Sequence, residues 1–227
     1  MIRSIILLFV VFLISCDNPA DSVNYPLIDP NQPAYDPIIL IDRTGKEWDI
    51  THAVLRYGFE ENNFRYGLGP RAMLPIQDPV FIGQGAPGYP ASGETFSVIG
   101  INFNADIRAY PLYTLYHHEV ANDRFGDQYV AVTFCPLKPL TAVYSRMLNP
   151  QGSFNLNFAP SGWVYNSLFV LHDYETESLW YPFIEEEVLR CISGTLADYE
   201  LPLLDSQEIP WNEWRQMNPT TKMLKKP

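Results

Sequence analysis

The sequence predicts a β-rich α+β fold, with a mostly antiparallel sheet, a few short helices and a single domain. Short runs of β-branched and aromatic residues recur between turn residues, as in strands joined by hairpins. The 20 prolines and 13 glycines among 227 residues disfavour long helices. Apolar residues make up 47% of the chain and charged residues only 18%, so the chain can bury a core and is not disordered throughout.

Composition also excludes several classes of protein. The chain has 15 Lys and Arg against 26 Asp and Glu, a formal net charge of −11. A nucleic-acid partner is not expected, because neutralising phosphates needs a basic surface. Collagen, coiled coils and multi-span membrane proteins are excluded by composition and by the lack of long apolar segments.

The N-terminus reads as a targeting segment. Arg3 precedes an apolar run over 5–13, which is shorter than the roughly 20 residues that span a bilayer. The run ends in Leu-Ile-Ser-Cys at 13–16, similar to a bacterial lipobox. We therefore expect residues 1–15 to be a signal peptide and lipidated Cys16 to hold the protein in a membrane of the bacterial cell envelope, facing the periplasm or the exterior. A plain signal peptide or an uncleaved anchor is the alternative.

The expected elements follow in order. Residues 16–37 form a Pro-rich tether, and the globular domain covers 38–227. It opens with a strand at 38–41 and a short helix capped by Thr51, before a mostly irregular stretch at 58–94. Further strands are expected at 96–103, 107–110, 128–134, 141–148, 154–158, 167–172 and 178–183, with helices at 112–120 and 210–217.

Cys135 is the first candidate site residue. It ends the strand at 128–134, just before Pro136, and alternation places it opposite Val130 and Val132, which belong to the core. An outward-facing Cys at a strand end can line a site. A small buried apolar residue is the equally weighted alternative.

The segment His-His-Glu-Val-Ala-Asn-Asp at 117–123 is the second candidate. At the end of a helix, His118 would share a face with Asn122, and Glu119 with Asp123. The pattern resembles a zinc-protease HExxH motif, but Asn122 replaces the second His, so we reject that function. His118 and Cys135 can together form a copper or zinc site or a thiolate–imidazole pair. A hydrogen-bonding His is the simpler interpretation.

The other cysteines bear on the same question. If Cys16 is lipidated, Cys135 and Cys191 remain in an oxidising compartment, where they can pair or stay free.

Six segments in order resemble a bacterial family catalogued as domain of unknown function 3179, over about 73–224. The segments are LPIQDPVF at 74–81, RAYPL at 108–112, HEVAND at 118–123, VTFCPL at 132–137, SGWVYNS at 161–167 and DYETESLW at 173–180. Many relatives continue Cys-Pro-Leu-Cys, whereas Lys138 follows Leu137 here, so a CxxC dithiol is impossible at this loop.

The resemblance implies that residues of these motifs belong to one site. They are His118, Glu119, Asn122, Asp123, Cys135, Asn166 and Trp180, and Arg108 joins them as a pocket residue. Cys135 would be the nucleophile or soft metal ligand, and His118 its partner. Glu119 and Asp123 would orient the His, while Asn122, Asn166, Trp180 and Arg108 line the pocket.

Two functions follow from these residues. The first is an uncharacterised cell-envelope lipoprotein whose Cys/His site binds copper or zinc or acts as a reactive thiolate. The alternative is a non-catalytic lipoprotein that binds a small molecule or protein partner in the envelope, with Cys135 in the core.

Overall fold

Strands are the main regular structure in a computed structural model that describes residues 36–69, 73–149 and 154–227. Residues 37–227 form one contact unit. The predicted signal peptide, Cys16 and most of the tether lie outside the described residues. Among those that are described, no helix has the length and apolar character needed to cross a bilayer.

The first sheet has five strands in the order β16-β6-β7-β17-β5. Its strands are β5 (Phe81–Ile82), β6 (Ser97–Phe103), β7 (Asp106–Pro111), β16 (Gln207–Pro210) and β17 (Lys222–Leu224). The predicted β6–β7 hairpin is confirmed, and its turn residues Asn104 and Ala105 have φ values of 48° and 66°. Two left-handed residues give the turn a twist that matches the strands. Helix α3 (Trp211–Met217) packs its two tryptophans against the outer face of this sheet.

The second sheet has four strands in the order β10-β9-β8-β4. They are β4 (Ile76–Gln77), β8 (Val120–Phe125), β9 (Gln128–Cys135) and β10 (Leu140–Ser145). On β9, Val130, Val132 and Phe134 pack toward residues of the first sheet, as predicted for one face. Ala131 and Cys135 belong to a second core cluster on the opposite face. Both faces of β9 are therefore buried.

The third sheet has six strands in the order β15-β14-β13-β12-β11-β3. They are β3 (Phe64–Tyr66), β11 (Phe158–Tyr165), β12 (Leu168–Asp173), β13 (Leu179–Phe183), β14 (Val188–Ser193) and β15 (Glu200–Pro202). Its far face is covered by β1 (Ile39–Ile41), β2 (Glu47–Asp49) and helix α1 (Thr51–Tyr57). The predicted helix is present, but Thr51 is its first residue rather than its cap, and the cap position is taken by Ile50, whose side chain makes no cap hydrogen bond.

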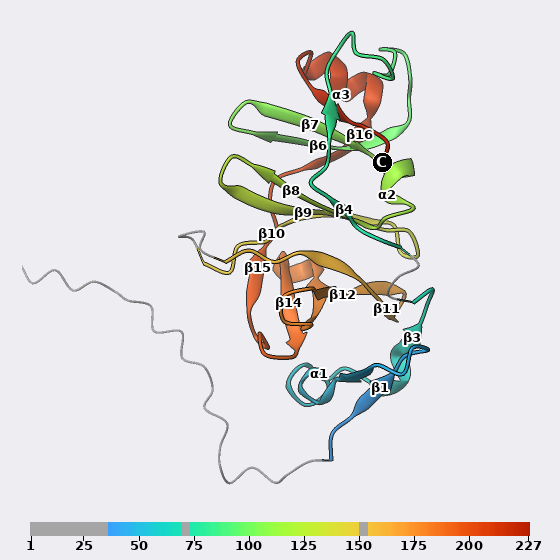
Figure 1. Ribbon diagram of the computed structural model, residues 1–227, viewed down its shortest axis with the longest axis vertical. Helices are drawn as coiled ribbons and strands as arrows, with labels where there is room; N and C mark the ends of the chain where they lie inside the picture. Colours follow the sequence, from blue (N-terminus) through green and yellow to red (C-terminus); the bar gives the residue numbers. More distant parts are fainter. Residues whose placement is uncertain (1–35, 70–72, 150–153) are drawn as a thin grey trace, which may run out of the picture. The chain divides into compact units, whose positions relative to one another are not determined.

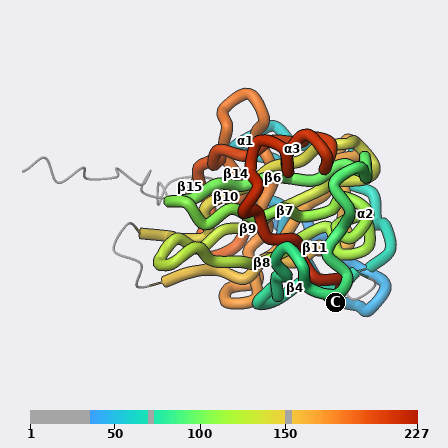
Figure 2. Tube along the Cα trace, turned by 90° about the horizontal axis from the view of Figure 1, so that it is seen from above, coloured from blue at the N-terminus to red at the C-terminus, as the bar shows by residue number. Residues whose placement is uncertain are grey.

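The sheets form successive layers, with a core cluster between each neighbouring pair (Figure 1). Figure 2 views these layers from the α3 end, so that β6 and β7 lie over β8 and β9. Most strand pairs are antiparallel, and β4–β8 and β7–β17 are parallel. This arrangement confirms the predicted β-rich α+β fold.

The helix predicted at 112–120 is wrong in its second half. Helix α2 (Leu112–Leu115) ends after about one turn, and β8 begins at Val120. The backbone N–H of Phe134 donates to the Glu119 carbonyl at 2.8 Å, so pairing with β9 determines the conformation here. Long-range pairing outweighs local helix propensity. The shared faces proposed for His118 with Asn122 and for Glu119 with Asp123 are therefore wrong.

Two further predictions are corrected. The strand predicted at 154–158 begins only at Phe158 and continues through Gly162, where its pairing with β12 is irregular. The irregular stretch at 58–94 contains β3, β4, β5 and the 3-10 helix η1 (Glu61–Asn63). Short edge strands of two or three residues are invisible in the sequence because they carry no alternation long enough to detect.

Candidate functional site

Three motif segments meet where β9 ends. The α2–β8 turn contributes Glu119, whose carbonyl accepts the Phe134 N–H. Strand β9 contributes Cys135, and the β11–β12 turn contributes Ser167, whose carbonyl oxygen lies 3.8 Å from the Cys135 sulfur. We call this meeting point, together with the neighbouring turn residues His118 and Asn166, the β9 end.

Cys135 lies inside the protein rather than on its surface. Its solvent exposure is 0%, and it packs in the core cluster between the second and third sheets. The prediction that Cys135 faces outward is therefore wrong, because the third sheet covers that face of β9. Its thiol is placed to donate a weak hydrogen bond to the Ser167 carbonyl, an arrangement that requires the protonated form.

His118 lies in the turn between α2 and β8, two residues before Val120, which pairs with Thr133 of β9. Its Nδ1 is 2.8 Å from the carbonyl oxygen of Leu74, which fixes the ring toward the segment before β4. The contacts recorded for the described residues include no hydrogen bond between this imidazole and the Cys135 thiol. Among the described residues, the His118 ring therefore bonds Leu74 and the Cys135 thiol faces Ser167, so the predicted thiolate–imidazole pair is not formed.

Glu119 is the most unusual residue of the β9 end. Its φ is 59°, a left-handed conformation that side chains other than Gly rarely adopt. Burial raises the pKa of its carboxyl group to about 7. A strained backbone and a half-buried acid that titrates near neutrality are both typical of functional sites.

The raised pKa of Glu119 predicts a pH-dependent stability. Because the folded state holds this proton more tightly than the unfolded state, the stabilisation is complete below about pH 4.5 and is lost as the pH rises through about 7. Glu119→Gln should therefore raise the free energy of unfolding at pH 8 by about 1–3 kcal/mol and have little effect at pH 4.5. Urea unfolding at both pH values measures this. Glu61→Gln, at an exposed acid, is the matched control, and an equal gain in both variants would exclude burial of Glu119 as the cause.

Arg108, Asn122 and Asp123 lie along the strands rather than at the β9 end. The Asn122 amide bonds both backbone groups of Phe158 on β11, at 2.8 and 3.0 Å. One oxygen of Asp123 accepts from Arg108 at 2.6 Å and from the Tyr110 hydroxyl at 2.5 Å. Each of these contacts joins strands and satisfies a buried polar group, and neither needs a ligand.

Of the remaining motif residues, some stabilise the fold and one lies at the β9 end. Trp180 has 0% exposure, and its indole N–H donates to Asp173 at 2.8 Å. Asp173 also accepts the Thr176 backbone N–H at 2.5 Å, so the DYETESLW segment builds the β12–β13 turn. Asn166 is exposed at the β11–β12 turn with φ 49°, beside Ser167. Of the predicted pocket residues, Asn166 alone lies at the β9 end.

The metal prediction has no support in the described part of the chain. Within it, no three His, Cys, Asp or Glu residues are grouped closely enough to hold a metal ion. Cys135 and Cys191 are both buried free thiols rather than a disulfide.

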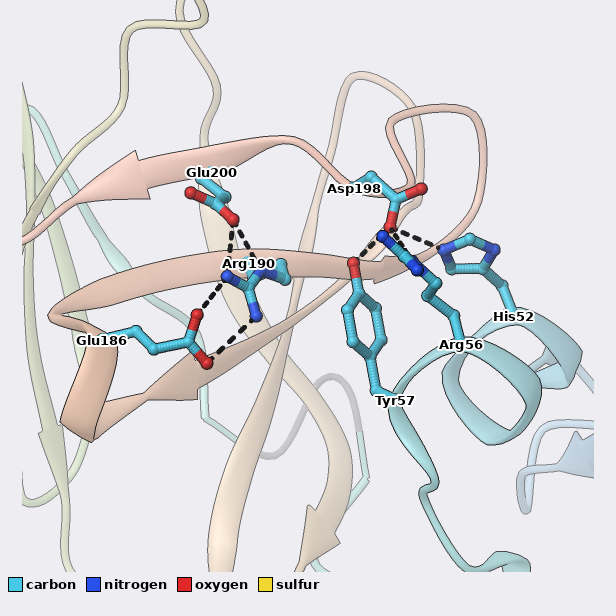
Figure 3. Close-up of polar contacts among 7 residues, drawn as sticks. All are labelled: His52, Arg56, Tyr57, Glu186, Arg190, Asp198 and Glu200. Carbon is cyan, nitrogen blue, oxygen red and sulfur yellow. Dashed lines mark hydrogen bonds and ion pairs between the residues drawn. The ribbon is translucent and has the colours of Figure 1, made fainter. Parts of the chain in front are cut away.

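A polar cluster that the sequence did not reveal joins α1 to the loop before β15 (Figure 3). His52 Nε2 lies 3.0 Å from Asp198, which also accepts from the Tyr57 hydroxyl, and Arg56 lies at 3.7 Å. Burial raises the pKa of Asp198, but the hydrogen bonds from Tyr57 and His52 outweigh it, so the net shift is downward. These contacts tie the N-terminal helix to the third sheet. Their spacing of about 146 residues explains why no local pattern indicates them.

The strand beside this cluster carries a second ion-pair group. Arg190 on β14 lies between Glu186 and Glu200, each with an oxygen 2.5 Å from the guanidinium (Figure 3). Both glutamates are exposed, so these pairs add little to stability.

The fold and the β9 end define a layered, β-rich protein with a buried thiol, that of Cys135, at the end of β9. A family model described as "Protein of unknown function (DUF3179)" matches residues 75–227, about two-thirds of the chain. The chain therefore belongs to this family, which confirms the predicted resemblance. No curated protein and no solved structure matches the chain.

Proposed function

We propose that the protein is a bacterial cell-envelope lipoprotein, anchored in the bilayer through lipidated Cys16, that uses Cys135 as a reactive thiol. The lipobox at 13–16 and the Pro-rich segment that follows support the anchor. The observation that carries the thiol is the meeting of three motif segments at the β9 end, where Glu119 is both strained and half-buried.

The chemistry requires removal of the thiol proton. Glu119 lies beside the last residues of β9, and its raised pKa makes it a base suited to proton transfer near pH 7. The surrounding turns are exposed at Asn166, Ser167 and Leu137, so the sulfur can be uncovered by a local opening. A thiolate formed there can attack an electrophilic substrate.

Cys191 offers an internal control for this proposal. It also has 0% exposure, but it lies within β14, between β13 and β15. Burial raises the pKa of its thiol to about 12, and its sulfur lies 3.2 Å from the Ser193 carbonyl. Exposing Cys191 requires separation of central strands, which is a far larger opening than at the β9 end.

The test is the rate of alkylation by iodoacetamide in the folded full-length chain, with each cysteine followed by peptide mass spectrometry. We expect Cys135 to react about tenfold or more faster than Cys191. Glu119→Gln should lower the ratio of the Cys135 rate to the Cys191 rate, because the added stability of this variant slows global opening for both thiols alike. Equal rates for the two thiols, both limited by global unfolding, would show that Cys135 is a core residue and would refute the proposal.

A further inference from the structure

A solvent-open pocket of about 520 Å³, which we call the cavity, lies between helix α3 and the loop that precedes β6, and no residue of the β9 end lines it. Gln84, Ser92 and Gly93 line it from the loop, and Asn212, Arg215 and Gln216 line it from α3. Its volume is within the range of small-molecule sites.

Hydrogen bonds hold the two walls of this cavity together. The indole N–H of Trp211 donates to the Ala91 carbonyl at 3.0 Å, and the backbone N–H of Asn212 donates to the Glu94 carbonyl at 3.1 Å. Figure 1 shows α3 and this loop side by side at one end of the layers. The two walls of the cavity are therefore joined to each other at both Trp211 and Asn212.

Arg215 gives the cavity a positive charge in a strongly acidic protein. Its Nη1 donates to the Pro90 carbonyl at 3.2 Å, and its guanidinium lies 5.2 Å from the Tyr89 ring centroid and 6.0 Å from that of Trp211. These contacts fix the guanidinium in place. Within the described residues no carboxylate comes within ion-pair distance of Arg215, so its charge is available to an anion.

Asn212 provides a second, independent feature. The carboxamide oxygen of this lining residue is buried and has no hydrogen-bond partner among the described residues. A buried acceptor without a partner is costly, so a ligand that offers it an O–H or N–H is favoured. Ser92, Gln84 and Gln216 surround it with further polar groups.

We propose that this cavity binds a small hydroxylated carboxylate of the size of a uronic acid. The Arg215 guanidinium takes the carboxylate, and the Asn212 oxygen accepts a hydrogen bond from a ligand hydroxyl. The amide and hydroxyl groups of the lining suit the remaining hydroxyls, and the lining has no acidic side chain to repel the anion. This site goes beyond the proposed thiol function and does not depend on it.

Isothermal titration of the full-length chain tests the ligand class, with D-glucuronate as the probe. D-glucose lacks the carboxylate, and acetate lacks the hydroxyls. We expect glucuronate to bind about tenfold or more tightly than either, since a charge-assisted hydrogen bond contributes about that factor. Equal affinity for glucose would refute the role of Arg215, equal affinity for acetate would refute the role of Asn212, and no binding of glucuronate would overturn the proposal.

Two variants assign the binding to this cavity. Arg215→Gln should weaken glucuronate binding about tenfold or more, with its melting temperature as the check on folding. Gln84→Glu changes an exposed loop residue that makes no side-chain hydrogen bond within the described residues, so it should fold normally and weaken binding to a similar extent by pairing with Arg215. Gln77→Glu adds the same charge on exposed β4 outside the cavity and should leave binding unchanged. Unaltered binding in the two cavity variants would place the ligand elsewhere and overturn the assignment.

Discussion

Replacing Asp123 with alanine should lower the free energy of unfolding by about 3–5 kcal/mol, the typical effect of removing one partner of a buried ion pair. Asp123 is 6% exposed, and one of its oxygens accepts from both Arg108 and Tyr110. The Arg108 guanidinium lies 4.8 Å from the Phe81 ring centroid and 4.1 Å from that of Phe125. Without Asp123, the carboxylate that would still pair with this charge, within the described part of the chain, is Asp106.

The charge cannot escape by losing its proton, because a guanidinium stays protonated in proteins. In the intact protein, burial lowers the pKa of the Arg108 guanidinium, but the hydrogen bonds to Asp106 and Asp123 outweigh burial and raise it above its ordinary value. The Nε of Arg108 is already buried with no hydrogen-bond partner among the described residues, so a second loss at Nη1 adds to an existing deficit. The expected cost is therefore that of a half-satisfied buried cation.

Urea denaturation at pH 7 measures the Asp123 effect. Asp127→Ala is the matched control, because Asp127 is an exposed acid in the adjoining β8–β9 turn and should change stability by no more than about 0.5 kcal/mol. In the Tyr110→Phe background the loss should be smaller, since the tyrosine hydroxyl no longer depends on the carboxylate. Equal changes in Asp123→Ala and Asp127→Ala would show that the Arg108 contact contributes nothing to the fold.

The sequence predicts those elements whose signals are local. The β6–β7 hairpin, strand β9 and helices α1 and α3 all carry alternation, turn residues or capping positions that are visible within about ten residues. Strand β8 is the counterexample. Its residues follow a helix-forming segment directly, and only pairing with β9 makes Val120 and Asn122 extended. No local pattern in a single sequence indicates which strand pairs with β8.

The candidate site was also only partly predictable, because its burial depends on how the sheets pack on one another. Alternation along β9 correctly separates Val130 and Val132 from Cys135. The same alternation does not reveal that the third sheet covers the other face of β9. Small residues such as Ala131 and Thr133 lie on that face, and in the sequence they resemble a partly polar, exposed face even though they are buried. The motif set did lead to the β9 end, but it also included residues such as Trp180 whose role is to build turns and cores.

Asn122 tests whether a motif residue that lies away from the β9 end serves the fold or the thiol. It is 1% exposed, and its amide donates to the Phe158 carbonyl while its oxygen accepts the Phe158 N–H. It thereby joins β8 of the second sheet to β11 of the third by satisfying both backbone groups at the start of a strand. Asn122→Ala should lower the free energy of unfolding by about 2–4 kcal/mol, because two buried backbone groups lose their partners.

Asn122→Asp keeps the shape of the side chain but removes the donor and adds a buried charge, so it should be at least as destabilising at pH 7 and less so at pH 4. Asn102→Ala, at an exposed asparagine of β6, controls for the loss of a strand amide. Calorimetric melting, combined with the Cys135 alkylation rate, separates the alternatives. If Asn122 maintains the fold, Asn122→Ala has a lower melting temperature, and both cysteines react faster because global opening becomes more frequent. If instead the melting temperature is unchanged and only the Cys135 reactivity is lost, Asn122 acts at the thiol. The assignment of Asn122 to the scaffold and of Glu119 to the reactive site would then be wrong.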